Sequence, residues 1–213
     1  MESHDPAIHD HMVNSTGAWK DTTGGLRNVL TTRLYVMTNT TLLRSNSPYL
    51  AETLNFLHDL GVPTVGLNSL IYSGKGESVG TGLSASDLPG LLDIARNLTQ
   101  KYNQRLIWYT PTQYCHFDPV QMELGVKGCT AALYNMCIEP DGSVLPCQSY
   151  YTSLGNILTE PWNRIWNSEL AIHLRERHYI PTECQACVLL AECGGGCPLE
   201  LETSHPICSP IQP

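Results

Sequence analysis

The sequence has few positive charges: 12 Lys and Arg stand against 20 Asp and Glu, which gives a formal net charge of −8 at pH 7. A chain that binds nucleic acid needs a basic surface, so nucleic acid is excluded as the main partner. No apolar run approaches the roughly 20 residues that cross a bilayer, and the opening MESHDPAIHD lacks the basic and apolar regions of a secretion signal. We therefore expect a cytoplasmic chain with no membrane partner.

Cysteine is absent from residues 1–114, whereas all nine cysteines lie between Cys115 and Cys208. An odd number leaves at least one thiol outside any disulfide framework. In a reducing compartment, a dense set of thiols is typical of metal binding. A disulfide scaffold and inert buried thiols remain alternatives, and Cys115 is expected to be a small buried residue outside the metal sites.

The first half of the chain alternates between helical and strand character. The predicted helices cover residues 18–30, 47–61 and 85–103, and the predicted strands cover 33–39, 62–68 and 105–111. This alternation is typical of βαβ units with a parallel sheet, and so of the α/β class. Three parallel strands with bare edges make a poor independent fold. We therefore expect this half to be part of a larger α/β barrel whose beginning is absent.

The second half has a different character. Two β-rich runs around Pro140-Asp141-Gly142 predict a hairpin over residues 136–147, because Gly142 can adopt the positive φ of a tight turn. Residues 160–178 predict one amphipathic helix. The remainder is expected to be loop-rich.

The cysteines of this half fall into two groups by spacing. Cys129 precedes Gly142 by twelve intervening residues, and Cys147 follows it after four, with Cys137 between them. The second group is Cys184-x2-Cys187-x5-Cys193-x3-Cys197, followed after ten residues by Cys208. Eight thiolates can serve two four-coordinate sites. Four soft sulfurs bind zinc or an iron–sulfur cluster, and spacing alone leaves a structural zinc-binding module open.

In these motifs the sequence resembles the radical S-adenosylmethionine (SAM) enzymes that carry a C-terminal SPASM domain. Their pattern is Cys-x(9–15)-Gly-x4-Cys, then Cys-x2-Cys-x5-Cys-x3-Cys, then a last cysteine, and the residues quoted above fit it in order. LGNI at 154–157 and PW..IW at 161–166 are also similar to the family. The resemblance implies the C-terminal part of a partial (β/α)6 TIM-like barrel over residues 1–124, lacking its N-terminal half. A SPASM auxiliary-cluster domain would follow over residues 125–213.

The resemblance also implies two auxiliary [4Fe–4S] clusters with interleaved ligands. One would be held by Cys184, Cys187, Cys193 and Cys208. The other would be held by Cys129, Cys147 and Cys197, with Cys137 as the fourth ligand. Asn39, expected at the end of a barrel strand, would contact the nucleoside of SAM in the intact enzyme.

Two departures from the family pattern limit the expected activity. The Cys-x3-Cys-x2-Cys loop that holds the SAM-cleaving cluster is missing; Cys193-x3-Cys197 comes nearest, but Glu200 occupies the third position. Gln148 stands where sulfatase-maturing members have an Asp base. We therefore expect this polypeptide to be inactive alone.

The intact enzyme, with SAM and a third [4Fe–4S] cluster, would generate a 5′-deoxyadenosyl radical and modify a peptide or a small cofactor precursor. Its auxiliary clusters would relay electrons or anchor substrate, and ferredoxin or flavodoxin would serve as redox partner. Besides the zinc module, a second alternative remains: a stand-alone iron–sulfur electron carrier that docks on a partner chain.

Overall fold

The computed structural model describes residues 1–202, so Cys208 lies outside the described residues. The chain divides into two compact units. The first, here the sheet unit, comprises Met1–Leu70, Val79–Thr110 and Val120–Gly125. The second, the cysteine unit, comprises Ile71–Ser78, Pro111–Pro119 and the residues from Val126 onward. Two short segments from the first half of the sequence therefore pack with the cysteines.

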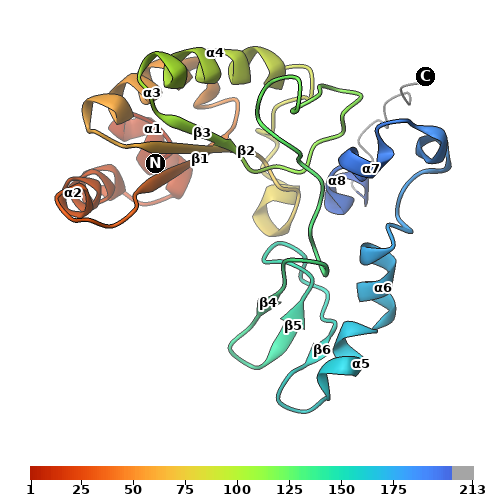
Figure 1. The fold of residues 1–213 in the computed structure, drawn as a ribbon. Coiled ribbons are helices and arrows are strands. Elements are labelled where there is room, and N and C mark those ends of the chain that lie inside the picture. The colour runs from red at the N-terminus through yellow and green to blue at the C-terminus, as the bar shows by residue number, and fades with distance from the viewer. Residues whose placement is uncertain (203–213) are drawn as a thin grey trace. The chain divides into compact units, whose positions relative to one another are not determined.

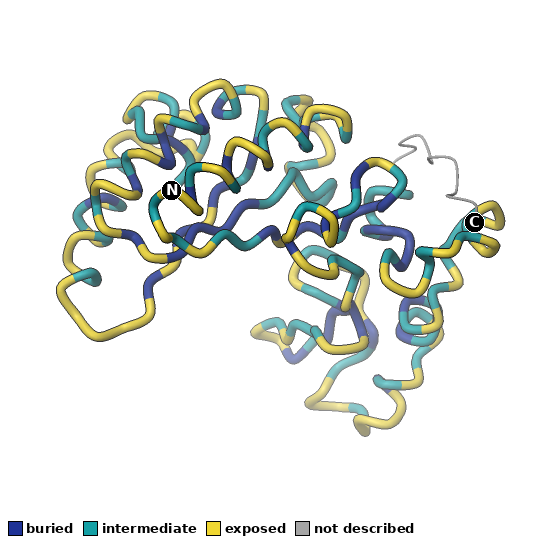
Figure 2. Tube along the Cα trace, turned by 45° about the horizontal axis from the view of Figure 1, so that its top comes forward, coloured by how far each residue is buried: buried dark blue, intermediate teal, exposed yellow. Residues whose placement is uncertain are grey.

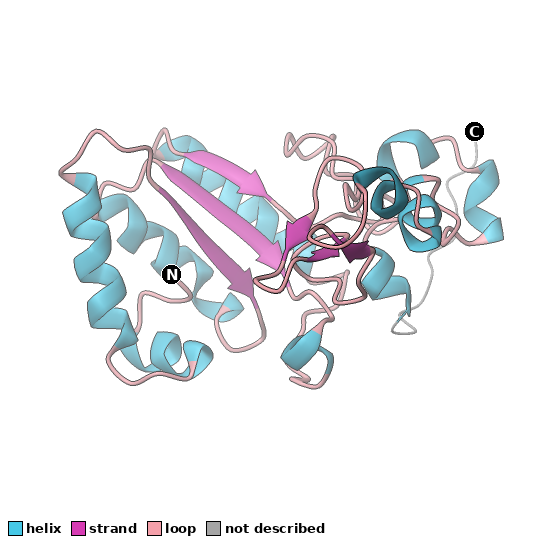
Figure 3. Ribbon diagram, turned by 90° about the horizontal axis from the view of Figure 1, so that it is seen from below, coloured by secondary structure: helices cyan, strands magenta, loops and turns pink. Residues whose placement is uncertain are grey.

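The sheet unit is built from four helices, a short 3₁₀ turn and three strands. In chain order they are α1 (Pro6–Val13), α2 (Ala18–Leu30), β1 (Met37–Leu42), η1 (Ser47–Tyr49), α3 (Leu50–Asp59), β2 (Thr64–Ser69), α4 (Leu88–Lys101) and β3 (Arg105–Trp108). The strands lie in the order β1-β2-β3, and both pairings are parallel (Figure 3). The α/β class and the parallel sheet predicted from the sequence are confirmed.

The core of this unit lies where α3 and α4 cover one face of the sheet (Figure 1). Its apolar side chains are almost fully removed from water: Leu42, Leu54, Leu57, Val65, Leu67, Leu92 and Trp108. The leucines of α3 and α4 recur at helical spacing, so each helix places one apolar stripe on the strands. In Figure 2 the first four residues of β2, the central strand, are buried, whereas β1 alternates between buried and exposed residues.

The start of this unit differs in two places from the predicted elements. A helix precedes them, α1, because Asp5 accepts hydrogen bonds from the Ala7 and Ile8 amides and Pro6 occupies the first turn. The first strand begins at Met37 instead of residue 33, since Leu34 and Tyr35 are exposed. Asn39 consequently lies in the middle of β1, opposite Gly66, and not at the end of a strand.

The cysteine unit contains short elements only. They are η2 (Gly74–Glu77), β4 (Cys137–Ile138), β5 (Ser143–Leu145), β6 (Gly155–Asn156), α5 (Trp162–Trp166), α6 (Glu169–Arg175), η3 (Thr182–Ala186), α7 (Leu190–Cys193) and α8 (Pro198–Glu202). The predicted hairpin is present as β4 and β5, and β6 extends it into an antiparallel sheet. The single helix predicted over 160–178 is two helices, because the Ser168 side chain caps a new start by accepting from the Ala171 amide.

The two units also differ in their cores. In the described part of the cysteine unit, an apolar cluster is formed by the buried residues Ala132, Val144, Leu154, Ile165, Ala171 and Leu174. Much of the rest of the unit is half-buried or exposed, as Figure 2 shows. Among residues 1–202, no helix is long and apolar enough to pass through a membrane.

Candidate metal centres

The hairpin positions Cys147 through the turn at Gly142. Gly142 has φ +88°, and a Cβ at this position would lie 2.7 Å from Asn156 Oδ1 and 2.7 Å from Leu158 Cγ. Glycine is therefore required for the turn and for the close approach of β6. The Ala132 amide donates to Pro146 O at 2.9 Å, which brings the segment after Cys129 beside the residue preceding Cys147.

Cys129, Cys147 and Cys197, here the hairpin group, lie close enough to influence one another electrostatically. Burial raises the pKa of the Cys129 thiol, and the Cys147 thiolate raises it further. Burial also raises the pKa of Cys197 to about 12, with the charge of Cys129 as the next cause. The three sulfurs come from segments far apart in sequence, so the fold assembles this group.

The hairpin group is supplied with donors that favour negatively charged sulfur. Hydrogen bonds from the backbone of Ala131 lower the pKa of Cys129, and those from Leu199 and Glu200 lower that of Cys197. The Arg177 guanidinium also lowers the pKa of Cys129. N–H···S bonds and nearby positive charge tune the potential of a bound cluster, so this donor set fits an iron–sulfur group.

Cys184, Cys187 and Cys193, here the loop group, meet around a separate apolar cavity. Burial raises the pKa of the Cys184 thiol, and the thiolates of Cys193 and Cys187 raise it further. Cys184 and Cys187 come from η3 and its end, and Cys193 ends α7. One C-x2-C turn and one helix end therefore place three thiols around a common space.

The three glycines that follow Cys193 all have positive φ. A Cβ on Gly194 would lie 2.9 Å from Arg177 Cζ, and one on Gly196 would lie 2.8 Å from Gln113 Cγ. The run Gly194-Gly195-Gly196 thus allows neighbouring segments to pack against the backbone between Cys193 and Cys197. Tyr179, whose hydroxyl donates to Gly194 O at 3.1 Å, is near both groups, since the charges of Cys129, Cys197 and Cys193 all raise its pKa.

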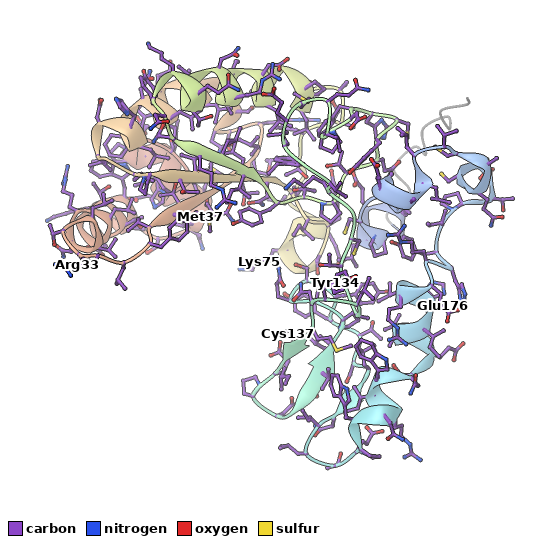
Figure 4. All side chains as sticks on the ribbon, in the orientation of Figure 1. Arg33, Met37, Lys75, Tyr134, Cys137 and Glu176 are labelled. Carbon is purple, nitrogen blue, oxygen red and sulfur yellow. The ribbon has the colours of Figure 1, made fainter. Side chains whose placement is uncertain are left out.

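Three residues singled out in the sequence are placed differently from these groups. Cys137 lies on β4 (Figure 4), where its sulfur donates to Glu139 Oε1 at 3.9 Å; within residues 1–202 it shows no interaction with the hairpin group. Asn39 is on the exposed side of β1 in the sheet unit. Cys115 is half-buried, instead of buried as expected, and it is disulfide-bonded and lines the loop-group cavity; its place outside the metal sites stays a prediction.

An open cavity of about 710 Å³ adjoins the loop group. Its lining includes Cys187 together with the charged or polar residues Glu176, Arg177, His178 and Gln185. One edge of the loop group is therefore accessible to another molecule. Sequence spacing gave no signal of this cavity, because its walls come from the end of α6 and from η3 and α7.

Part of the cysteine unit is similar to a known protein family. Residues 129–188 match the SPASM family, described as an iron–sulfur cluster-binding domain. This chain resembles the C-terminal portion of a radical SAM enzyme with a SPASM domain. The matched SPASM region contains the hairpin and the C-x2-C turn, while Cys193 and Cys197 follow it.

Two known proteins, one compared by sequence and one by structure, are similar to most of this chain. An AdoMet-dependent heme synthase of Methanosarcina barkeri is 22% identical over 202 residues, which cover 88% of this chain and 58% of the relative. The structure of Streptococcus suis SuiB bound to its precursor peptide SuiA matches with a TM-score of 0.74, 14% identity and coverage of 99% of this chain and 51% of SuiB.

A second solved structure, native anSMEcpe with bound AdoMet and the Cp18Cys peptide, matches with a TM-score of 0.62. It is 15% identical, and the match covers 98% of this chain and 61% of the other. The chain therefore spans between half and about three fifths of the length of these relatives. At these identities the structural matches establish the fold.

Proposed function

We propose that this chain supplies the auxiliary iron–sulfur part of a radical SAM/SPASM enzyme, with one [4Fe–4S] cluster in each cysteine group. The observation that carries the proposal is that cysteines from distant parts of the sequence lie near one another. After burial, the charge of Cys129 contributes most to the raised pKa of Cys197, although Cys197 follows Cys193 in the same motif, whereas the charge of Cys193 contributes most to the raised pKa of Cys184. Two interleaved groups need two separate sites.

The donor chemistry of the hairpin group suits an iron–sulfur cluster, because backbone hydrogen bonds reach Cys129 and Cys197. A zinc ion draws its sulfurs to about 2.3 Å, whereas a four-iron cluster spreads its ligands around a cube. The backbone donors near Cys129 and Cys197 supply the N–H···S bonds that clusters use.

In this proposal six cysteines of the cysteine unit bind the clusters, and two neighbouring side chains support them. Cys129, Cys147 and Cys197 hold one cluster, and Cys184, Cys187 and Cys193 hold the other. Bound clusters supply one-electron transfer. Arg177 offsets the negative charge of the hairpin group, and Tyr179 donates to Gly194 O beside the loop group. The assignments of Cys137 and Cys208 as fourth ligands rest on the family pattern.

The substrate of the complete enzyme is proposed to be a peptide or a small cofactor precursor. The peptide is suggested by SuiB and anSMEcpe, whose structures contain peptides, and the cofactor precursor by the heme synthase. The open cavity beside Cys187 provides a surface for substrate or for a redox partner such as ferredoxin or flavodoxin. Free thiols for cluster binding suit the reducing cytoplasm.

Cleavage of SAM needs residues that this sequence does not contain. Residues 1–213 include no Cys-x3-Cys-x2-Cys triplet. We therefore propose that these residues, as part of a (β/α)6 TIM-like barrel over 1–124 and a SPASM domain over 125–213, do not cleave SAM by themselves. The third cluster would lie on another stretch of polypeptide. Asn39 as a contact of SAM is not supported by its position within β1.

Anaerobic reconstitution with iron and sulfide tests the proposal. We expect about eight irons per chain and a brown chromophore if both sites bind four-iron clusters. Cys187→Ala should remove roughly half of the iron, because it deletes one ligand of one cluster. The matched control is Val188→Ala, an exposed neighbour, which should retain the full content. A colourless protein that binds zinc alone would instead establish the zinc-binding module.

A further inference from the structure

The open cavity of about 710 Å³ that adjoins the loop group is lined by residues between 176 and 191, all of them in the cysteine unit. Besides the polar residues given above, its lining contains the apolar side chains of Ile180, Val188 and Leu190. Val188 is 55% exposed. Apolar walls with a few fixed polar groups are typical of small-ligand sites. The polar groups of this lining therefore indicate which ligand the cavity fits.

Arg177 is held in place at this cavity by both its side chain and its backbone. Its Nη1 donates to Leu190 O at 3.2 Å and to Ala191 O at 3.3 Å. Its amide donates to Leu174 O at 3.2 Å, and its carbonyl accepts from the Ile180 amide at 3.1 Å. The guanidinium is therefore positioned by the fold of the cysteine unit.

Gly194 lies over the face of this guanidinium. A Cβ built on Gly194 would lie 2.9 Å from Arg177 Cζ and 3.2 Å from each of Nη1 and Nη2, and these are its three nearest atoms. A point that is nearer to the central carbon than to the nitrogens lies above the plane of the group and not at an edge. The glycine therefore packs on the face and leaves the edges of the guanidinium uncovered.

One edge of the Arg177 guanidinium has no partner among residues 1–202. Nη1 bonds to two carbonyls, whereas Nε and Nη2, which carry three more N–H donors, form no hydrogen bond or ion pair with these residues. The carboxylate in the lining, that of Glu176, lies instead 3.1 Å from His178 Nε2. Two parallel N–H groups on one edge match the two oxygens of a carboxylate.

We propose that this cavity binds a carboxylate carried on an apolar body, with Arg177 as the anion-binding residue. The carboxylate takes the Nε–Nη2 edge, and the apolar part covers the wall that contains Val188. That this ligand is the substrate rests on the proposed function, whereas carboxylate binding itself needs no cluster. A peptide carries the group at its end or on acidic side chains, and a small precursor carries it as a free acid.

Calorimetric titration of the reconstituted full chain tests the proposal and separates these two sources. The probes are the acetylated tripeptide alanyl-alanyl-leucine and 4-phenylbutyrate, each compared with its neutral amide. The preferred acid should bind about tenfold more tightly than its amide, because the amide cannot form the charge-assisted pair. Preference for the tripeptide identifies a peptide end, and preference for phenylbutyrate identifies a small acid. If neither acid binds more tightly than its amide, the proposal is overturned.

Two neighbouring variants test the role of Arg177. Arg177→Gln should reduce the affinity for the acid to that for the amide. Glu176→Gln, the matched control, removes a negative charge from the same lining and should bind the acid at least as tightly as the unmodified chain. Unchanged acid binding in Arg177→Gln would place the anion on another group, and the proposal would be wrong.

Chemical protection gives the same information without a substitution, should Arg177→Gln fail to fold. Phenylglyoxal modifies arginine, and the preferred acid should slow its reaction at Arg177 but not at exposed Arg33 of the sheet unit, labelled in Figure 4. Equal reaction of Arg177 with and without the acid would contradict the proposal.

Iron analysis of the titrated sample distinguishes this inference from the proposed function. About eight irons per chain without any preference for an acid would overturn the carboxylate site alone. A chain that binds no iron would overturn the proposed function, whichever acid it binds.

Discussion

The sheet unit and the cysteine unit of the same chain are stabilised in different ways. The sheet unit buries long aliphatic side chains between two helices and three strands, with Leu57, Val65 and Leu67 fully buried. The cysteine unit has two- and three-residue strands, and its apolar cluster around Ile165 has six buried residues, two of which are alanines. We therefore expect apolar burial to stabilise the first unit, and we expect the second to depend more on what its thiols bind.

Removing iron should give the largest difference between the two units. Without clusters, the half-buried thiols of Cys129, Cys184 and Cys197 remain unlinked, so the cysteine unit should lose protection against hydrogen exchange. The strands β1–β3 should keep theirs. Mass spectrometry of exchanged peptides, with and without clusters, measures both at once. Equal loss in both units would show that they unfold as one.

Leu57→Ala should destabilise the sheet unit whether or not iron is present. Leu57 on α3 is fully buried, and removal of such a side chain lowers the free energy of unfolding by about 2–5 kcal/mol. Urea unfolding followed by the fluorescence of buried Trp108 measures it. Ile94→Ala on α4, where the side chain is 42% exposed, is the matched control and should have a much smaller effect.

Gly142→Ala should act on the hairpin group in particular. The substitution forces an L-residue into positive φ, which costs about 1–2 kcal/mol, and pushes its Cβ against Asn156 and Leu158. We expect weaker iron retention at Cys129, Cys147 and Cys197 than at the loop group. Selective alkylation of those cysteines in the reconstituted variant would show it.

The control for this change is Gly25→Ala in α2. No atom lies within 4 Å of a Cβ built there, and alanine favours a helix over glycine by up to about 1 kcal/mol. The control should therefore raise the stability of the sheet unit and leave iron binding unchanged. Identical iron retention in both glycine variants would contradict the role given to the hairpin turn.

The smallest expected effect is an acid sensitivity at Asp10 in the sheet unit. The amides of Trp19 and Gly17 donate to its carboxylate at 2.7 and 2.6 Å, and these bonds lower the pKa of Asp10 below its ordinary value of 3.8. Because the folded-state pKa is lowered, the stabilisation is complete above 3.8 and is lost as pH falls through the lower value.

Asp10→Asn tests whether this stabilisation is lost as the pH falls. The variant should be less stable than the unmodified chain at neutral pH, and the difference should shrink as the pH falls below 3.8. Urea unfolding at several pH values, followed by Trp108 fluorescence, gives the comparison. A difference that stays constant with pH would show that the ionised carboxylate has no part in it.

The sheet unit was the more predictable half. Its parallel order follows from alternating helical and strand segments, and the leucines of α3 mark the buried stripe directly in the sequence. Boundaries were less certain: Leu34 and Tyr35 have strand character but are exposed, so the strand starts later and Asn39 moves away from its end. A strand prediction rests on the type of side chain, whereas the residue at which a strand begins to pair with its neighbour depends on burial.

In the cysteine unit, short-range spacing predicted the hairpin and the C-x2-C turn. It did not predict β6 or the break at Ser168, because those depend on a third segment pairing with β5 and on a local cap. The role of each cysteine as a ligand stays a prediction. The structure groups six of them and leaves Cys137 beside Glu139.

By itself, the sequence determined the parts of this protein that are local: helices with apolar stripes, a glycine turn, and thiols spaced to reach one metal group. Spacing alone left open which thiols meet, and only the family resemblance grouped them in advance. The tertiary structure decided that Cys197 lies within electrostatic reach of Cys129 and that Cys115 lines the cavity of the loop group. The physical reason is that spacing fixes how far a side chain can reach, whereas packing across positive-φ glycines fixes which distant segments lie within that reach.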